Sequence, residues 1–178
     1  RGVETEEDIR EFLAADLSKV SDGSELTDME KGVSIIQDAI AAGKHIRIIG
    51  DYDVDGVTST YILYKGLIGL HAKCDKFIPH RIKDGYGLHE NAIRRAREYG
   101  VEVILTCDNG IAAAEAVSLA KEFGMTVVVT DHHEVPFVQE PDGRRYILPA
   151  ADAVIDPKRP EDHVFKEICG AVVAWKFM

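Results

Sequence analysis

Three aspartates alternate with other residues in one short stretch of the chain: Asp51, Asp53 and Asp55, followed directly by Gly56. Carboxylates this close raise one another's pKa unless a cation lies among them. Carboxylate oxygens are also the ligands that hard divalent cations prefer. The stretch therefore predicts a site for a divalent metal ion.

Three other interpretations compete with a metal site. An exposed acidic turn is disfavoured by the mostly apolar run 46–49 directly upstream. An EF-hand calcium loop starts with the same pattern, but it needs a helix in front and glutamate at its twelfth position, where this chain has Ile62. A phosphatase of the haloacid dehalogenase type stays open, because residues 53–57 resemble the D-x-D-G-[TV] loop of that family.

Short apolar runs alternate with helical patterns through the middle of the chain. The runs are residues 45–50, 73–79, 101–107, 125–130 and 153–155. The helical patterns between them are residues 57–70, 89–99 and 112–123. Such alternation with continuous apolar strands is typical of a parallel sheet that is covered on both faces. We therefore predict an α/β fold with a parallel β-sheet of about five strands and helices on both faces.

Polar side chains follow the ends of these predicted strands. Asp108 follows the third run, Asp131, His132 and His133 follow the fourth, and Asp156 follows the fifth. Because parallel sheets bind ligands at the carboxyl ends of their strands, these groups should meet the three alternating aspartates at one edge. Mixed aspartate and histidine ligands favour manganese over magnesium or zinc. Shared carboxylates would hold two ions about 3.5–4 Å apart, as in phosphoester hydrolysis.

The N-terminal segment, residues 1–28, is polar and acidic. It contains a predicted helix over residues 6–15. Asp28 is expected to cap the next helix, over residues 29–42, because aspartate is a favoured residue at that position.

A long connection, residues 134–150, interrupts the alternation. It is polar and contains three prolines. A loop of this length inside a compact domain is typically a functional flap or a disordered excursion. We expect residues 135–137 to tether its first part and residues 142–145 to form a mobile tip.

The composition is that of a globular protein, with 46% hydrophobic and 29% charged residues. The formal net charge of −10 argues against a generally basic nucleic-acid-binding surface, although bound metal ions would reverse the sign of a local pocket. No apolar run reaches the length of a membrane span, so no membrane partner is expected. The three cysteines are widely spaced, which predicts reduced thiols in the cytoplasm.

Three motifs together carry a family resemblance: D-Y-D-V-D-G-V-T-S at 51–59, T-C-D-N-G-I at 106–111 and T-D-H-H-E at 130–134. They resemble the DHH phosphoesterases, and most closely the RecJ-like single-strand-specific 5′-to-3′ exonucleases of that family. Further segments that resemble this group are I-P-H-R at 78–81, G-Y-G-L at 85–88, D-P-K-R-P at 156–160 and C-G-A-V-V-A-W-K at 169–176. The dehalogenase interpretation loses its support, because it leaves the motif at 130–134 unexplained.

The resemblance implies a role for each matching residue. The implied metal ligands are Asp53, Asp55, Asp108 and His132, and His133 would be the catalytic residue that faces the scissile phosphate. The residues implied to orient these ligands are Asp51 and Asp131. The residues expected to contact the substrate are Arg81, Lys158 and Arg159, with Tyr86 as a candidate for stacking on a base.

The activity that the resemblance implies is hydrolysis of single-stranded DNA from its 5′ end with two divalent cations, Mn²⁺ first and Mg²⁺ second. RNA and short oligonucleotides are alternative substrates. We expect residues 1–28 to be an N-terminal extension. Residues 29–178 are expected to be the DHH domain, ending before the family's fourth motif and its C-terminal substrate-binding domain. The chain by itself would then be a weak enzyme, or a metal- or nucleic-acid-binding scaffold fragment.

Overall fold

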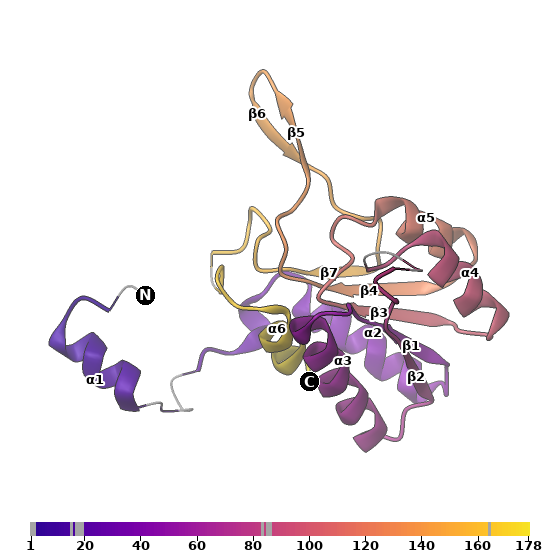
Figure 1. The fold of residues 1–178 in the computed structure, drawn as a ribbon, viewed down its shortest axis with the longest axis horizontal. Helices are drawn as coiled ribbons and strands as arrows, with labels where there is room; N and C mark the ends of the chain where they lie inside the picture. Colours follow the sequence, from indigo (N-terminus) through magenta and orange to yellow (C-terminus); the bar gives the residue numbers. More distant parts are fainter. Residues whose placement is uncertain (1–2, 15, 17–19, 83, 85–86, 164) are drawn as a thin grey trace.

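A parallel sheet of five strands forms the centre of the computed structural model (Figure 1). Its strands are β1 (Ile46–Ile49), β2 (Cys74–Phe77), β3 (Val103–Cys107), β4 (Thr126–Thr130) and β7 (Ala153–Ile155). They lie in the order β2-β1-β3-β4-β7, and every neighbouring pair is parallel. The structure describes residues 3–14, 16, 20–82, 84, 87–163 and 165–178.

Helices cover both faces of this sheet. The helices on one face are α2 (Met29–Ala41), α3 (Val54–Gly69) and α6 (Gly170–Phe177). Those on the other face are α4 (Glu90–Glu98) and α5 (Ala114–Glu122), as Figure 1 shows. The predicted α/β architecture is confirmed, and each of the five strands lies within its predicted apolar run.

Side chains alternate between the two faces along each strand of the sheet. In β3, Val103, Leu105 and Cys107 pack in the core under α2, α3 and α6, whereas Ile104 packs in the core under α4 and α5. Each of these four side chains is at most 1% exposed. A strand that is buried on both faces has no polar side, which is why the runs read as continuously apolar.

The direction in which strands are added reverses between β1 and β3. The chain passes from β1 outward to β2 and then returns to the other side of β1 to form β3. At such a switch point the loops leave the sheet in opposite directions and open a crevice outside the carboxyl ends of the strands. A ligand of this domain is therefore expected beside the loops that follow β1 and β3.

The N-terminal segment forms two short helices. α1 (Glu6–Ala14) agrees with the predicted helix over residues 6–15, of which residue 15 lies outside the described residues. A 3-10 helix, η2 (Gly23–Glu25), follows, and Leu26 is 2% exposed in the core under α2. The last residues before the predicted domain boundary thus pack against the sheet domain.

Asp28 is the N-cap residue of α2, as predicted, but its side chain does not make the capping hydrogen bond. Its backbone has a positive φ of 62°, and the carboxylate makes no hydrogen bond to the helix. Instead, Asp28 Oδ2 accepts hydrogen bonds from the backbone N–H of Val154 at 3.1 Å and from Nη1 of Arg159 at 3.0 Å. A tertiary contact with β7 has replaced the local cap.

The long connection contains a two-stranded antiparallel hairpin, β5 (Phe137–Glu140) and β6 (Gly143–Tyr146), which projects away from the sheet in Figure 1. Part of the connection therefore has regular structure, in which Phe137 and Tyr146 pair across the strands with ring centroids 6.0 Å apart. Val135 is 2% exposed and tethers the segment as expected. Phe137 is 45% exposed and does not.

Two findings bear on the predicted environment of the chain. The three cysteines are free thiols: Cys107 is buried, Cys74 is partly buried and Cys169 is exposed. Among the described residues, no helix combines the length and the apolar character that a membrane span requires.

Gly56 packs tightly in the first turn of α3, since a Cβ there would lie 2.6 Å from the carbonyl oxygen of Asp51. We expect Gly56→Ala to lower the free energy of unfolding by about 1–3 kcal/mol, because backbone atoms cannot move aside as a flexible side chain would. Gly69→Ala, in the same helix, is the matched control: its Cβ would meet nothing within 4 Å. It should leave stability unchanged or raise it by up to about 1 kcal/mol. Urea unfolding measures both, and equal losses would contradict the steric role.

Candidate metal centre

The chain after β1 places two aspartates at the beginning of α3. The helix begins at Val54 and Asp53 is its N-cap, because Asp53 Oδ1 accepts a hydrogen bond from the backbone N–H of Gly56 at 2.9 Å. The helix thus begins three residues before the predicted helical segment 57–70, because a capping carboxylate lets it start earlier. Asp55 consequently lies in the first turn, where the helix dipole favours a negative charge.

Asp55 is held by a second helix that is distant in the sequence. Its Oδ2 and Oδ1 accept hydrogen bonds from the backbone N–H groups of Gly170 at 2.7 Å and Ala171 at 2.8 Å, the first two residues of α6. A Cβ at position 170 would lie 2.7 Å from Oδ1 of Asp108. Glycine therefore permits this close approach. The sequence analysis did not identify Gly170 as a site residue, although it belongs to the quoted segment 169–176.

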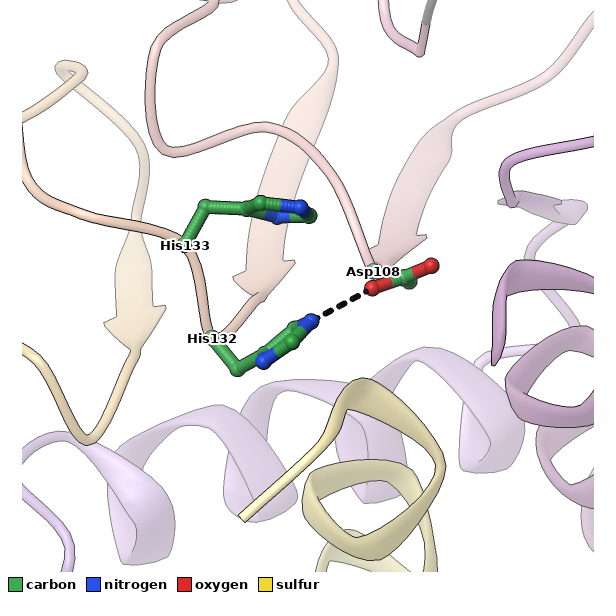
Figure 2. A group of neighbouring side chains, drawn as sticks. All are labelled: Asp108, His132 and His133. Atoms are coloured by element: carbon green, nitrogen blue, oxygen red, sulfur yellow. Dashed lines mark ion pairs between the residues drawn. The ribbon is translucent and has the colours of Figure 1, made fainter. Parts of the chain in front are cut away.

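Asp108 and His132 bring the loops after β3 and β4 together. Asp108 directly follows β3 with a positive φ of 60° and is 2% exposed. Nε2 of His132 lies 3.0 Å from Oδ1 of Asp108 (Figure 2) and 3.3 Å from Oδ2 of Asp55. One imidazole nitrogen thus contacts two carboxylates. A divalent cation bound to these groups would take the place of the proton on that nitrogen.

Potential donor atoms form two groups that share one residue. One group takes an atom from each of Asp108, His132 and His133, and the other takes an atom from each of Asp51, Asp53 and Asp108. Within each group the atoms lie within 4.8 Å of one another. Figure 2 shows the first group, with both imidazole rings extending toward the side of Asp108. Asp108 therefore lies where two ions could share a carboxylate.

Asp51 was predicted only to orient the ligands, but its surroundings make it a candidate ligand as well. It is 1% exposed, and its Oδ1 has no hydrogen-bond partner among the described residues. A buried carboxylate oxygen without a partner is costly unless a cation or a proton neutralises it. The donor set of this centre therefore fits divalent cations.

Asp131 organises the turn that carries the two histidines. It is 1% exposed, and its Oδ1 accepts hydrogen bonds from the backbone N–H of His132 and from Nδ1 of His133, both at 2.7 Å. Its Oδ2 accepts a hydrogen bond from the backbone N–H of Ile111 at 2.9 Å. The contact with Nδ1 fixes the orientation of the His133 ring. Contacts of this kind would let Asp131 orient the two histidines, and this role stays a prediction.

Asn109, to which the sequence analysis gave no role, joins the ends of β1 and β3. Its Nδ2 donates hydrogen bonds to the carbonyl oxygens of Ile49 at 3.0 Å and Cys107 at 2.8 Å. This bridge keeps the carboxyl ends of the two strands in register, and with them the aspartates that follow each strand. Its position directly after Asp108 is the signal that the sequence offered.

Burial and neighbouring charge perturb the carboxylates of the site. Burial, with the nearby carboxylate of Asp55, raises the pKa of Asp108 to about 6, against the opposing hydrogen bond from His132. Burial also raises the pKa of Asp51 and raises the pKa of Asp156 to about 7. These groups resist ionisation chiefly because burial removes water from the charged form, and neighbouring carboxylates add to the effect.

The pKa values of the two histidines are also raised. The hydrogen bond to Asp131 raises the pKa of His133 to about 9, and the hydrogen bond to Asp108 raises the pKa of His132. The raised pKa values of the histidines therefore show that the neighbouring carboxylates favour positive charge in this pocket. Such a pocket favours the binding of cations.

Two of the predicted substrate-binding residues lie near the centre. Lys158 lines a groove together with both histidines, and its Nζ lies 3.6 Å from carboxylate oxygens of Glu134 and Glu167. Arg81 is exposed, and its guanidinium lies 5.4 Å from the centroid of the Tyr52 ring. Both cations are therefore placed to meet an anion that approaches the metal centre.

Arg159 has a different environment, which does not support its predicted contact with substrate. Its side chain is 10% exposed, its Nη1 donates to Asp28 and to the carbonyl oxygen of Val154, and its Nε and Nη2 donate to Glu161. The guanidinium is thus committed to structural contacts. Tyr86, the predicted stacking residue, lies outside the described residues.

Comparison with known proteins identifies a family. The description "DHH family, N-terminal domain" matches residues 45–178. The chain is 41% identical over 177 residues to the single-stranded-DNA-specific exonuclease RecJ of Bacillus subtilis (strain 168), covering 99% of this chain and 21% of that protein. It is 36% identical over 156 residues to RecJ of Escherichia coli (strain K12), covering 86% of this chain and 26% of that protein. The chain thus spans about a quarter or less of these curated relatives.

Solved structures give the same result. A crystal structure of exonuclease RecJ bound to manganese matches with a TM-score of 0.73 and 33% identity, covering 85% of this chain and 36% of that chain. RecJ from Thermus thermophilus in complex with Mn²⁺ matches with a TM-score of 0.65 and 30% identity, covering 85% of this chain and 20% of that chain. The dehalogenase interpretation is thereby left without support.

Replacing Asp131 tests its structural role. We expect Asp131→Ala to lower the free energy of unfolding of the metal-free protein by roughly 1.5–3 kcal/mol, because buried donors lose a charged acceptor. Asp142→Ala, at the exposed tip of the β5–β6 hairpin, is the control and should change stability by less than about 0.5 kcal/mol. Urea unfolding in the presence of a chelator measures both. A loss as small as that of the control would contradict the assignment.

Proposed function

The chain belongs to the DHH family, and from this membership we propose that it is the metal-binding catalytic part of a 5′-to-3′ exonuclease specific for single-stranded DNA. Curated relatives at 36–41% identity are single-stranded-DNA-specific exonucleases. Because the chain spans only part of their length, the activity and the substrate of the whole protein belong to the proposal. The observation that carries it is the position of Asp108 in both groups of donor atoms.

Two divalent cations are the proposed cofactors, with Mn²⁺ as the first choice and Mg²⁺ as the second. Related RecJ structures are described as complexes with Mn²⁺ or Mg²⁺. The proposed ligands are Asp53, Asp55, Asp108 and His132, and the unpartnered Oδ1 supports Asp51 as an addition. Bound ions of this kind polarise a phosphate oxygen and make water a better nucleophile at neutral pH.

The remaining polar residues of the site would position the substrate. His133, oriented by Asp131, is proposed to hydrogen-bond an oxygen of the scissile phosphate or to assist the leaving group. Arg81 and Lys158 are proposed to hold phosphates on either side of the scissile bond.

The proposal also covers the substrate, the domain boundaries and the location in the cell. Single-stranded DNA is the substrate named for the relatives, and RNA and short oligonucleotides are the alternatives to be tested beside it. We assign residues 29–178 to the DHH domain, with residues 1–28 as an extension. A cytoplasmic location is proposed because three free thiols suit a reducing compartment.

Metal binding can be measured through stability. Mn²⁺ at about 100 times its Kd should stabilise the wild-type protein by about 2.7 kcal/mol through mass action. Asp108→Asn should lose most of this gain, because it removes a charged oxygen from both groups of donors, and His133→Gln should lose less. Asp38→Asn, at an exposed position of α2, is the control and should keep the full gain. Calorimetric titration checks the same order, and wild-type Mn²⁺ affinity in Asp108→Asn would contradict the shared ligand.

Activity is tested in the full-length protein that contains this chain. It should release nucleotides from the 5′ end of single-stranded DNA with Mn²⁺ or Mg²⁺ and should degrade duplex DNA poorly. Asp108→Asn should lower turnover at least about 10²–10³-fold, the size of effect seen when one group that stabilises a transition state is removed. The 178-residue chain alone should be slower than the full-length protein. Strand binding without turnover at any Mn²⁺ concentration would instead establish a scaffold.

A further inference from the structure

The basic side chains of this acidic protein are concentrated in one segment. Residues 71–99 contain seven Lys or Arg and four Asp or Glu, a net charge of +3, although the whole chain has a net charge of −10. The segment comprises β2, α4 and the loop between them. Its surface is therefore the place where a polyanion meets the least repulsion.

An open groove of about 230 Å³ lies between β2 and α4. The residues that line it include Arg47, Lys76, Phe77, Arg95 and Tyr99, although the ammonium of Lys76 lies over the ring of Tyr64 in α3, 3.9 Å from its centroid. Because β2 is the outermost strand of the sheet on this side, the groove runs along an exposed edge of the molecule. Two guanidinium groups, of Arg47 and Arg95, lie beside rings of this groove, and Lys76 adds a cation at the neighbouring edge of β2.

Aromatic rings stand beside these cations. Tyr99 is 67% exposed, and the guanidinium of Arg47 lies 5.0 Å from the centroid of its ring. Arg47 is itself held by two 2.6 Å hydrogen bonds to Asp75, so it fixes one side of the ring in place. The guanidinium of Arg95 lies 5.6 Å from the centroid of the Phe77 ring. An exposed ring beside cations offers both a stacking surface for a base and partners for a phosphate.

The loop between β2 and α4 connects this groove to the metal centre. At one end Arg81 lies over the ring of Tyr52, which is part of the acidic motif after β1. At the other end Asp84 lies 3.9 Å from Arg95. Side chains of one short loop therefore contact both the motif that carries the proposed ligands and the groove.

We propose that this β2–α4 face is a second contact surface for the nucleic-acid strand, separate from the metal centre and used by nucleotides that lie beyond the scissile bond. The inference rests on the proposed function. An acidic peptide that adds a strand to the open edge of β2 is the competing occupant. That edge is only four residues long and carries Lys76, a residue type that natural edge strands use against pairing. Cations beside an exposed ring match phosphates and bases better.

The test measures strand binding by the full-length protein as a function of salt concentration. Each phosphate contact that is lost should reduce the slope of log K against log[salt] by about 0.7, so Lys76→Gln/Arg95→Gln should reduce it by about 1.4. Tyr99→Ala should weaken binding roughly tenfold with an unchanged slope. Lys31→Gln, on α2 beside the opposite edge strand β7, is the matched control and should change neither quantity. Thermal unfolding shows whether each variant folds. If the double variant does not fold, Lys76→Gln and Arg95→Gln are measured singly, and each should reduce the slope by about 0.7.

A short substrate separates this inference from the proposed function. Hydrolysis of a dinucleotide, which has no nucleotides beyond those that flank the scissile bond, should be the same in the variants as in the wild type. Wild-type slopes and affinities in the variants, together with normal hydrolysis, would overturn the inference and leave the proposed function intact. An absence of hydrolysis of both single-stranded DNA and the dinucleotide in the wild type would refute the proposed function, whereas the binding slopes would still test the role of this face. Normal strand binding with loss of binding to a polyglutamate peptide would identify a protein-docking surface and refute the proposal.

Discussion

Mutual repulsion among carboxylates at the carboxyl ends of β1 and β3 is the constraint that the surrounding structure has to satisfy. Asp53 is stabilised by the N–H of Gly56, and Asp55 by the N–H groups at the beginning of α6. These are backbone dipoles at helix N-termini, which stabilise negative charge without bringing in a positively charged side chain. A lysine in the same place would occupy the position of a metal ion. The stabilisation observed leaves the carboxylates able to bind cations.

This constraint also explains why distant parts of the chain meet at the site. α6 begins at Gly170, where a side chain would collide with Asp108, and its first two N–H groups reach Asp55. Asp131 holds the turn of the two histidines and ties it to the loop after β3 through Ile111. Each contact narrows the range of positions that the donor atoms can take. Preorganisation of this kind is what a site with several charged ligands requires.

The β2–α4 face and the metal centre differ in the source of their positive charge. The metal centre is acidic, and bound cations would reverse its sign, so its attraction for phosphates depends on metal. The face formed by β2 and α4 carries its own positive charge, from residues such as Lys76 and Arg95. A strand could therefore meet this face whether or not metal is present. An overall charge of −10 hides this difference, because the local excess of cations is averaged over the chain.

The sequence by itself determined the sheet, the edge at which the site lies and most of its residues. Apolar runs of strand length are a local property, and the acidic and histidine motifs directly follow them, so a parallel sheet necessarily collects them at one edge. Tertiary structure decided what local patterns cannot encode. The Asp28 side chain binds Arg159 and β7 instead of making the capping hydrogen bond of α2, which also removes Arg159 from the substrate-binding candidates. The hairpin in residues 137–146 is formed by cross-strand pairing, and the contact of Gly170 with the site spans more than a hundred residues. The contacts of Asp28 with Arg159 and of Gly170 with Asp55 depend on which surfaces the folded sheet brings together, and no short window of sequence contains both partners. The hairpin is local in sequence and depends on its own cross-strand pairs.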